Sequence, residues 1–370
     1  MTIYKRQSVM LLMILLWALA EDTALAEKSN QPNEEETARW TFVPLPVLSF
    51  SSDTGFMVGI YPNIFYNPDT SNPDQKSNSI SFLGIYTEKQ QWTMSGATDW
   101  FFDVDRYNLK FSTEVSRYPS SFYGIGPGTD LDDSESYTPL RFDLATAFRF
   151  KIVSGLYLGP RVLFTSIDMV EVENGEMLDT GNIPGSDGAT FLGGGPSLTW
   201  DKRDNGTYPH SGFIADVKLD FFRKELGSSE NYTQLALDYR HFFQLYGEHV
   251  LGVELYSRLT HGTVPFQVLP HLGGSSLMRG YFNARFRDMV SVATQIEYRF
   301  PIYWRFGGVV FAGVGQVAPR LSELSVDDLK YATGFGIRFA FVEDPKVNVR
   351  IDFAFSPESF DFHIKALEAF

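Results

Sequence analysis

The sequence predicts an all-β fold, a transmembrane antiparallel β-barrel of about 16 strands. Three observations predict this fold class. Many segments alternate apolar and polar residues with period two, these segments are longer than the strands of soluble proteins, and aromatic residues gather at their ends. From Trp40 onward no apolar run approaches the roughly 20 residues of a transmembrane helix, which excludes a helical membrane protein.

The alternation is clearest in five segments: Asn108–Val115, Phe213–Phe221, Gln234–Leu245, Val290–Phe300 and Val347–Phe355. In Val290–Phe300 most even-numbered residues are apolar or aromatic, whereas the odd-numbered residues include Glu297 and Arg299. Charges in mid-strand suit a water-filled lumen, and lengths of about 9 to 12 residues suit a tilted strand that crosses a bilayer. The alternative is a secreted sandwich or a periplasmic propeller, but strands of soluble sheets average about 5 to 6 residues.

Counting all such segments gives about sixteen expected strands, an even number as a closed barrel from one bacterial chain requires. The expected strands are Phe42–Phe50, Gly55–Tyr66, Asn78–Glu88, Gln91–Phe102, Arg106–Arg117, Thr138–Phe150, Ser154–Met169, Gly188–Asp201, His210–Phe222, Glu230–Gln244, His249–His261, Met289–Phe300, Phe306–Val317, Lys330–Phe341, Lys346–Phe355 and Phe360–Phe370. Long and short connections mostly alternate, which places long loops outside and short turns in the periplasm. The longest loop, Gly262–Asp288, lies between the eleventh and twelfth expected strands.

The first 26 residues have the pattern of a secretory signal peptide. Lys5 and Arg6 precede the apolar run Val9–Ala20, which is too short to span a bilayer, and Ala24-Leu25-Ala26 fits a cleavage site. An N-terminal membrane anchor is the alternative. Residues 27–39 are polar and acidic and are predicted to form a short periplasmic leader, so the barrel domain is expected to occupy residues 40–370.

The composition narrows the chemistry. The net charge of -14 argues against a nucleic-acid partner, because phosphate binding needs clustered Lys and Arg. The chain has no Cys, which excludes disulfides and thiolate metal sites. The 6 His are scattered without a HExxH spacing, and no GxSxG motif occurs. The acidic run around Asp132, Asp133 and Glu135 lacks the spacing of a calcium loop and is expected to be solvated. We therefore expect no metal, no cofactor and no catalytic residues.

The stretch Leu269–Asp288 is predicted to fold back into the lumen. Gly273, Gly274 and Gly280 permit the backbone angles that such a loop needs. Arg279 carries five donors and cannot be deprotonated, so inside a lumen it needs carboxylates or carbonyls. Candidate partners on polar strand faces are Glu297, Asp352 and Asp238. An ordinary surface loop is the alternative.

A second stretch, Trp200–Phe213, is rich in turn formers and is predicted to be a structural turn rather than a chemical site. Its residues of interest are Asp201, Arg203, Asp204, Asn205, Gly206, Pro209 and Gly212. Arg203 lies between two aspartates in the sequence and is expected to pair with one of them.

Three stretches resemble the BamA/TamA superfamily of outer-membrane assembly proteins, also known as bacterial surface antigen barrels. Leu272–Tyr281 resembles the inward loop motif, an Arg-Gly-aromatic preceded by Gly-Gly; Trp200–Phe213 resembles the periplasmic turn; and Phe122–Pro127 resembles a Phe-x-Gly-Ile-Gly loop. The resemblance implies that Arg279, Gly280 and Tyr281 lie inside the barrel with the arginine bound to acidic wall residues. It also implies that the terminal aromatic, Phe370, is the signal that the assembly machinery recognises.

The sequence departs from this family in two respects. The family often has Phe-x-Asp-x-Gly in a later strand, whereas here Gly313 stands in place of the Asp. Residues 27–39 are also too few to form a periplasmic POTRA domain, so we expect a short member without them.

The resemblance implies a barrel in the outer membrane of a Gram-negative cell that inserts or exports polypeptides through a seam between its first and last strands. Pro44 and Pro46 in the first strand fit a weak seam, because proline cannot donate to the ladder. The expected partners are outer-membrane lipids, lipopolysaccharide and periplasmic or polypeptide clients. A passive pore for small solutes and a barrel-borne lipid hydrolase are the alternative functions.

Overall fold

The structure is a computed structural model and describes residues 39–51, 55–68, 76–343 and 346–370. The predicted signal peptide and all but the last residue of the predicted leader lie outside the described residues.

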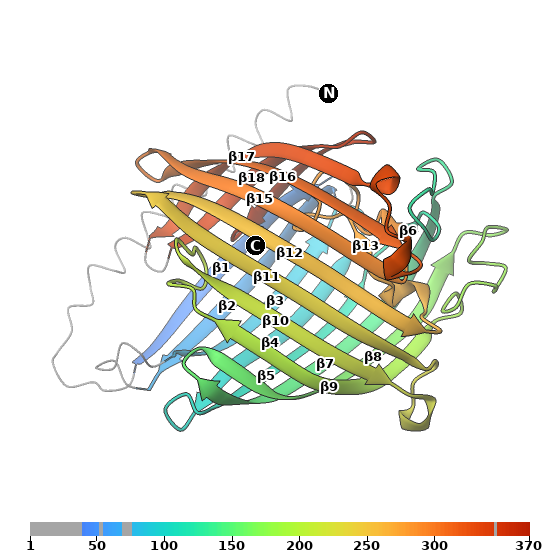
Figure 1. Ribbon diagram of the computed structural model, residues 1–370, viewed down its shortest axis with the longest axis horizontal. Coiled ribbons are helices and arrows are strands. Elements are labelled where there is room, and N and C mark those ends of the chain that lie inside the picture. The colour runs from blue at the N-terminus through green and yellow to red at the C-terminus, as the bar shows by residue number, and fades with distance from the viewer. Residues whose placement is uncertain (1–38, 52–54, 69–75, 344–345) are drawn as a thin grey trace.

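Sixteen long strands wind around a common axis and form a tilted antiparallel barrel (Figure 1). They are β1 (Arg39–Ser51), β2 (Gly55–Asn67), β3 (Asn78–Thr87), β4 (Trp92–Phe102), β5 (Tyr107–Arg117), β7 (Glu135–Val153), β8 (Leu156–Val172), β9 (Ala189–Asp201), β10 (Gly212–Phe222), β11 (Tyr232–Tyr246), β12 (His249–Gly262), β15 (Val290–Tyr303), β16 (Phe306–Ala318), β17 (Lys330–Glu343), β18 (Lys346–Phe355) and β19 (Phe360–Ala366). Each of the sixteen overlaps one of the expected strands, so the predicted fold class is confirmed.

Antiparallel ladders join consecutive barrel strands from β1 to β19. β5 pairs with β7 and β12 pairs with β15, because the intervening strands are short and lie in loops. These short strands are β6 (Ser120–Phe122), β13 (His271–Leu272) and β14 (Phe286–Arg287). β19 lies beside β1 and brings the two ends of the sheet together. The barrel is therefore nearly closed, with the seam at this junction.

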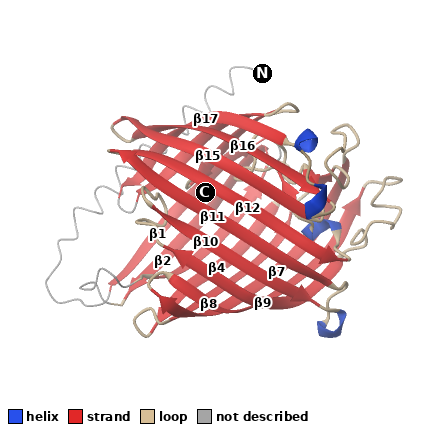
Figure 2. Cartoon of the chain, in the orientation of Figure 1, coloured by secondary structure: helices blue, strands red, loops and turns tan. Residues whose placement is uncertain are grey.

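The two ends of the barrel differ. One end, the loop end, carries the long connections and all four short 3-10 helices of the described chain (Figure 2). These are η1 (Lys224–Leu226), η2 (Phe266–Val268), η3 (Leu321–Glu323) and η4 (Val326–Asp328). The other end, the turn end, carries mostly short turns. In barrels of this kind long loops face the outside. No helix in the described part of the chain is long and apolar enough to cross a membrane.

The outer face of the barrel is apolar. On β2 the exposed fractions of Phe56, Val58 and Ile60 are 55%, 54% and 65%, whereas Met57 between them is buried toward the lumen. Tyr303 and Trp304 are exposed at a turn, where an aromatic girdle belongs. Alternate side chains thus point to lipid and to the lumen, as the period of two requires.

The last expected strand, Phe360–Phe370, was wrong at its end. β19 stops at Ala366, because Leu367 has a left-handed backbone (φ 65°) and turns the chain into the lumen. The cause is Glu368, a charged residue that finds its partners Arg338 and Asn348 inside the barrel.

Candidate functional site

The loop between β12 and β15 folds back into the lumen. Gly273, Gly274 and Gly280 all have positive φ, at 106°, 130° and 108°. The backbone N–H of Gly274 donates to the carbonyl of Tyr281 at 3.0 Å, which closes the tip of the loop. At Gly280 a Cβ would lie 3.1 to 3.2 Å from the backbone of Phe355 on the barrel wall. A glycine is needed here both for the conformation and for the close approach.

Arg279 lies at the tip of this loop and is buried. Its Nη2 donates to Glu297 Oε2 at 2.6 Å, and its Nη1 donates to Asp352 Oδ2 at 2.9 Å. The guanidinium also lies over the ring of Phe311, 3.5 Å from the centroid. Two carboxylates and an aromatic face from three different strands hold one arginine, so the position of the loop tip is defined by charge as well as by packing.

The two carboxylates serve further arginines, and together these groups form what we call the lumen ion network. Its members are Arg279, Arg299, Arg338, Arg350, Glu297, Asp352 and Glu368, all of them buried. Arg299 donates to Glu297 at 2.9 Å, and Arg338 and Arg350 donate to Asp352 at 2.6 and 2.8 Å. Because Glu297 and Asp352 each accept from more than one arginine, removal of one member leaves other buried charges without a partner.

Asp238, the third candidate partner, does not contact Arg279. It accepts from Arg240 at 2.6 Å, and Arg240 also pairs with Glu254. Glu254 in turn accepts from Gln295 Nε2 at 2.6 Å, and Gln295 Oε1 accepts from the backbone N–H of Met278 at 2.8 Å. Asp238 is therefore linked to the loop only through a chain of intermediate side chains.

Gly313, the departure from the family pattern, has a steric explanation. A Cβ at this position would lie 3.1 Å from Met278 Sδ and 3.2 Å from Gln295 Cγ. Met278 is fully buried and precedes Arg279 in the loop. An aspartate at position 313 would therefore compete with Met278 for space. Glu297 and Asp352 bind the arginine instead.

The outer part of the loop contacts the family-like stretch Phe122–Pro127 and the residues just after it. Arg285 forms an ion pair with Glu358 at 2.7 Å and donates to Thr129, just beyond Phe122–Pro127. The N–H of Gly126 donates to the carbonyl of Arg287 at 2.8 Å. Phe122 packs edge-on against Phe266 in an apolar cluster at the loop end. The Phe-x-Gly-Ile-Gly stretch thus anchors the inward loop.

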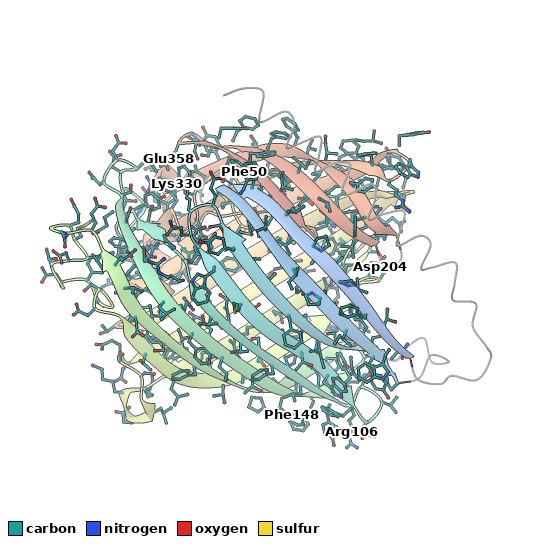
Figure 3. The ribbon with its side chains drawn as sticks, turned by 180° about the vertical axis from the view of Figure 1, so that it is seen from behind. Phe50, Arg106, Phe148, Asp204, Lys330 and Glu358 are labelled. Atoms are coloured by element: carbon teal, nitrogen blue, oxygen red, sulfur yellow. The ribbon has the colours of Figure 1, made fainter. Side chains whose placement is uncertain are left out.

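The turn between β9 and β10 lies at the turn end, where Asp204 is labelled in Figure 3. Arg203 pairs with Asp201 at 2.9 Å, whereas Asp204 Oδ1 accepts from the backbone N–H groups of His210 and Ser211. Asn205 Oδ1 accepts from two further backbone N–H groups. Pro209 is buried. Gly212 has φ 91°, and a Cβ there would clash with the carbonyl of Lys202. Each of these contacts shapes the turn.

This turn also crosses the mouth of the barrel. Thr207 Oγ1 donates to the carbonyl of Lys346 at 2.9 Å, although β9 and β18 lie far apart in the strand order. The ring of Tyr208 lies 5.4 Å from the guanidinium of Arg299. The turn therefore contacts the lumen ion network from the turn end of the barrel.

Phe370 also lies inside the lumen, although the sequence predicted a strand position for it. Its ring packs with Phe242 and Val250, and Arg299 Nη2 donates to its carbonyl at 2.8 Å. Sequence reasoning missed this placement and the roles of Arg338 and Arg350. The break in the alternation at Glu368 was the signal in the sequence that could have revealed it.

His271 is a titratable group of the loop that the sequence did not single out. Burial, and then the positive charges of Arg287 and Arg258, lower its pKa to about 4. Its imidazole is therefore held neutral at physiological pH.

Comparisons with known proteins agree with the fold. BamA from Haemophilus ducreyi lacking POTRA domains 1-3 has a TM-score of 0.60 at 13% identity, covering 90% of this chain and 71% of that one. CdiB from Acinetobacter baumannii has a TM-score of 0.53 at 12% identity, covering 90% of this chain but only 60% of that one. At these identities the likeness concerns the fold alone. No curated protein matches the sequence.

The family assignment comes from the sequence itself. The family model of the Omp85 superfamily domain matches residues 70–362, which is most of the barrel. This match confirms the resemblance to BamA-like barrels, and the chain belongs to the Omp85 superfamily of outer-membrane β-barrels.

Proposed function

We propose that this barrel assists the insertion of outer-membrane proteins or the translocation of polypeptides, through its seam between β1 and β19. The observation that carries the proposal is the inequality of the two seam strands. β1 has 13 residues and β19 has 7, so part of β1 has no residue of β19 beside it. A strand edge without a partner is a template for another chain.

The prolines of β1 weaken this edge further. Pro44 faces Pro62 in the β1–β2 register, and neither residue has an N–H, so this pair cannot be a hydrogen-bonded pair. Hydrogen-bonded and non-hydrogen-bonded pairs alternate in an antiparallel ladder, so the even-numbered residues of β1 turn their backbone groups toward the seam. Pro44 and Pro46 thus remove two donors from the seam edge. A seam with fewer hydrogen bonds costs less to open.

A passive pore is less well supported. The inward loop and the lumen ion network occupy the lumen beside β15–β18, and the turn that carries Tyr208 crosses the turn-end mouth. An open pore needs a continuous water-filled path, whereas this lumen is obstructed at more than one level.

The remaining parts of the proposal follow the family. The chain reaches the outer membrane after removal of a signal peptide at residues 1–26, residues 27–39 form a short leader, and residues 40–370 form the barrel. Its partners are outer-membrane lipids, lipopolysaccharide and periplasmic or polypeptide clients. The barrel is not an enzyme, so neither lipid hydrolysis nor another reaction is assigned to it.

A disulfide lock tests the seam, and the absence of Cys from the chain makes the test clean. The rings of Phe50 on β1 and Phe362 on β19 lie 5.8 Å apart across the seam. Phe50→Cys with Phe362→Cys should lower the amount of assembled outer-membrane protein or exported polypeptide severalfold in producing cells. Addition of a reductant should restore it.

The matched control locks β18 to β19 instead. Phe353 and Phe362 face each other in an existing ladder, so Phe353→Cys with Phe362→Cys should leave function unchanged. Equal function of the two locked proteins would contradict the proposal. A large constitutive conductance of the wild-type barrel in planar bilayers would favour the pore instead.

A further inference from the structure

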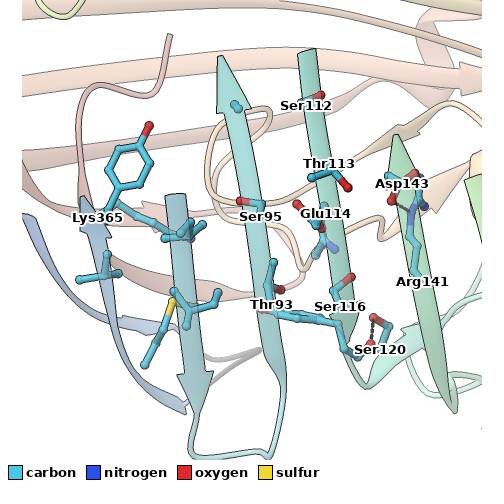
Figure 4. Close-up of a pocket in the computed structure, with 18 of the residues that line it drawn as sticks. Thr93, Ser95, Ser112, Thr113, Glu114, Ser116, Ser120, Arg141, Asp143 and Lys365 are labelled. Carbon is cyan, nitrogen blue, oxygen red and sulfur yellow. Dashed lines mark hydrogen bonds and ion pairs between the residues drawn. The ribbon is translucent and has the colours of Figure 1, made fainter. Parts of the chain in front are cut away.

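The lumen contains a cavity on the side away from the ion network. Its volume is about 1010 Å³, and it is lined by residues of β1–β8, β18, β19 and the inward loop. Figure 4 shows part of its wall, with Ser95, Thr113 and Glu114 on neighbouring strands. A volume of this size is typical of a site for a small molecule, which ranges from about 300 to 1,000 Å³.

The wall of the cavity nearest the seam is apolar. Met57, Leu83 and Ile85 line it from the lumen face of β2 and β3, and Val349 and Ile364, which lie on the outer face of β18 and β19, line it where it reaches the seam. Phe82 faces the outside next to Leu83, so β3 is apolar on both faces around these two residues. A water-filled lumen does not explain such a wall, because contiguous exposed apolar surface marks a binding site.

The inward loop does not cover this wall. Its apolar residues Leu272, Met278 and Tyr281 pack together with Ala293 and Val317, on the opposite side of the lumen. The apolar wall near the seam therefore has space beside it for a ligand.

The cavity also contains a buried cation. Arg287 lines the cavity and is 3% exposed. Its Nη1 donates to the carbonyl of Phe266 at 3.2 Å and its Nη2 to that of Ala284 at 3.4 Å, whereas its Nε has no hydrogen-bond partner. Within the described chain it has no ion pair with a carboxylate, unlike Arg141 in the same cavity, which is paired with Asp143. A buried guanidinium without a counter-charge is unfavourable, and an anion at this position would relieve the cost.

We propose that this cavity binds a single-chain anionic amphiphile, with its alkyl chain along the apolar wall and its carboxylate or phosphate head on Arg287. The cavity is lined from both sides of the seam, by Pro46 and Leu48 on β1 and by Ile364 and Leu367 at β19. An alkyl chain can therefore enter from the surrounding lipid at the junction where the barrel is weakest.

An amphiphile fits the cavity better than a polypeptide does. The inward loop bounds the cavity through Gln267 and Asn283, and Leu367 lines it near the turn end. An extended peptide would also bring backbone donors and acceptors to the side chains of Met57, Leu83 and Ile85, which offer no hydrogen bonds, whereas hydroxyl groups such as those of Ser81, Thr93 and Ser95 lie on the rest of the wall. The ligand site goes beyond the proposed handling of polypeptides and does not depend on it.

The test is photo-crosslinking in lipid nanodiscs, which contain no detergent to compete for the cavity. The probe is palmitate with a diazirine on its alkyl chain, and labelled peptides are mapped by mass spectrometry. We expect labelling of lumen-facing residues of β2 and β3. Leu83→Trp, which fills the cavity, should lower this labelling about tenfold or more, whereas Phe82→Trp on the lipid face of the same strand should change it less than about twofold.

The head group is tested with Arg287→Gln and with competitors. Arg287→Gln should weaken binding about tenfold, the scale of a lost hydrogen bond to a charged group. Unlabelled palmitate and lysophosphatidic acid separate a carboxylate from a phosphate head, and a neutral monoacylglycerol should compete about tenfold less well than the better of the two. Heat-dependent gel migration checks that each variant is folded.

Three results would overturn the proposal. Equal labelling of the Leu83→Trp and Phe82→Trp proteins would mean that the probe reports only lipid around the barrel. Equal competition by the neutral lipid, or a co-purified peptide in the cavity in place of an amphiphile, would remove the assigned ligand class. The Leu83→Trp arm remains decisive if Arg287→Gln does not fold.

Discussion

The lumen wall near the ion network and the wall near the seam differ in how they use charge. β15, β17 and β18 supply Glu297, Arg299, Arg338, Arg350 and Asp352 to the lumen, and the inward loop inserts Arg279 among them. From Trp40 onward, β1, β2 and β3 contain no Asp, Glu, Lys or Arg. The inward loop fills the space beside the first wall, whereas the second wall borders a cavity of about 1010 Å³.

The difference shows where the position of the inward loop is fixed by charge and where the lumen can accept another occupant. Buried ion pairs with several partners each accept only one arrangement of the loop, because a displaced charge loses its counter-ions. The strands β1–β3, which are uncharged from Trp40 onward, set no such condition and tolerate a change of occupant or the opening of the adjacent seam. We call the wall of β15, β17 and β18 with the ion network the rigid wall, and the wall of β1–β3 the adaptable wall. The first carries charges that face the lumen, and from Trp40 onward the second carries none.

The largest expected effect comes from removing the charge at the loop tip. Arg279→Ala leaves Glu297 and Asp352 each without one partner and removes the cation over Phe311. Loss of one partner of a buried ion pair costs about 3–5 kcal/mol, so the folded barrel should unfold at a clearly lower urea concentration.

The control for this variant is Arg320→Ala. Arg320 is exposed and pairs loosely with Glu323 at 3.7 Å, so its loss should cost less than about 1 kcal/mol. Similar urea midpoints for the two variants would show that the ion network does not hold the loop.

The second effect concerns Phe370 near the turn end. The family resemblance implies that it is an assembly signal, and in the structure its ring packs inside the lumen. Phe370→Ala removes a buried ring from its packing with Phe242 and Val250 and should destabilise the assembled barrel by about 2–4 kcal/mol. The measurement is urea unfolding of protein refolded in micelles, without any assembly machinery. Phe370→Leu, which keeps an apolar side chain, should lose less than half as much. If Phe370 serves only as an assembly signal, both refolded variants will match the wild type.

The third effect depends on pH and concerns His271 in the inward loop. The folded pKa of His271, about 4, lies below its ordinary value of about 6.5, so the unfolded chain binds a proton more readily. The stability from neutral His271 is therefore fully present above about pH 6.5 and is lost as the pH falls toward about 4. We expect a loss of about 1–2 kcal/mol between pH 7.5 and pH 5.

The measurement compares wild type with His271→Gln, because carboxylates also titrate at low pH. The difference in unfolding free energy between the two proteins should shrink as the pH is lowered. A difference that stays constant from pH 7.5 to pH 5 would mean that His271 is accessible to protons in the folded loop.

Much of the rigid wall could be predicted from the sequence. Alternation over residues 290–300 gave the orientation of Glu297, and the chemistry of Arg279 required a carboxylate near it. Asp238 was an equally good candidate in the sequence, but it faces Arg240 in the structure. Choosing among acids on different strands requires the register and the depth of the loop, which depend on contacts between residues far apart in the chain.

The adaptable wall could not be predicted in the same way. Its apolar side chains on β3 look like an ordinary buried strand in the sequence, and nothing there distinguishes Arg287 from Arg285. In the structure Arg285 has Glu358 and Arg287 has no carboxylate among the described residues. A cavity forms where side chains from strands far apart in the sequence leave space unfilled, so no pattern along the chain reveals it. The turn of the chain at Leu367 was missed because the alternation up to Ala366 continues smoothly.

The smallest effect concerns the turn between β9 and β10, and it distinguishes structure from function at the turn end. Asp204 accepts hydrogen bonds from the N–H groups of His210 and Ser211, much as a helix cap does. Asp204→Ala should therefore cost about 1 kcal/mol in urea unfolding, whereas Asp187→Ala in an exposed loop should cost nothing measurable. Loss of protein assembly in cells, without this loss of stability, would instead make the turn a contact surface for a periplasmic partner. Loss of stability alone would mean that the family-like turn serves the fold, because its carboxylate is occupied by its own backbone.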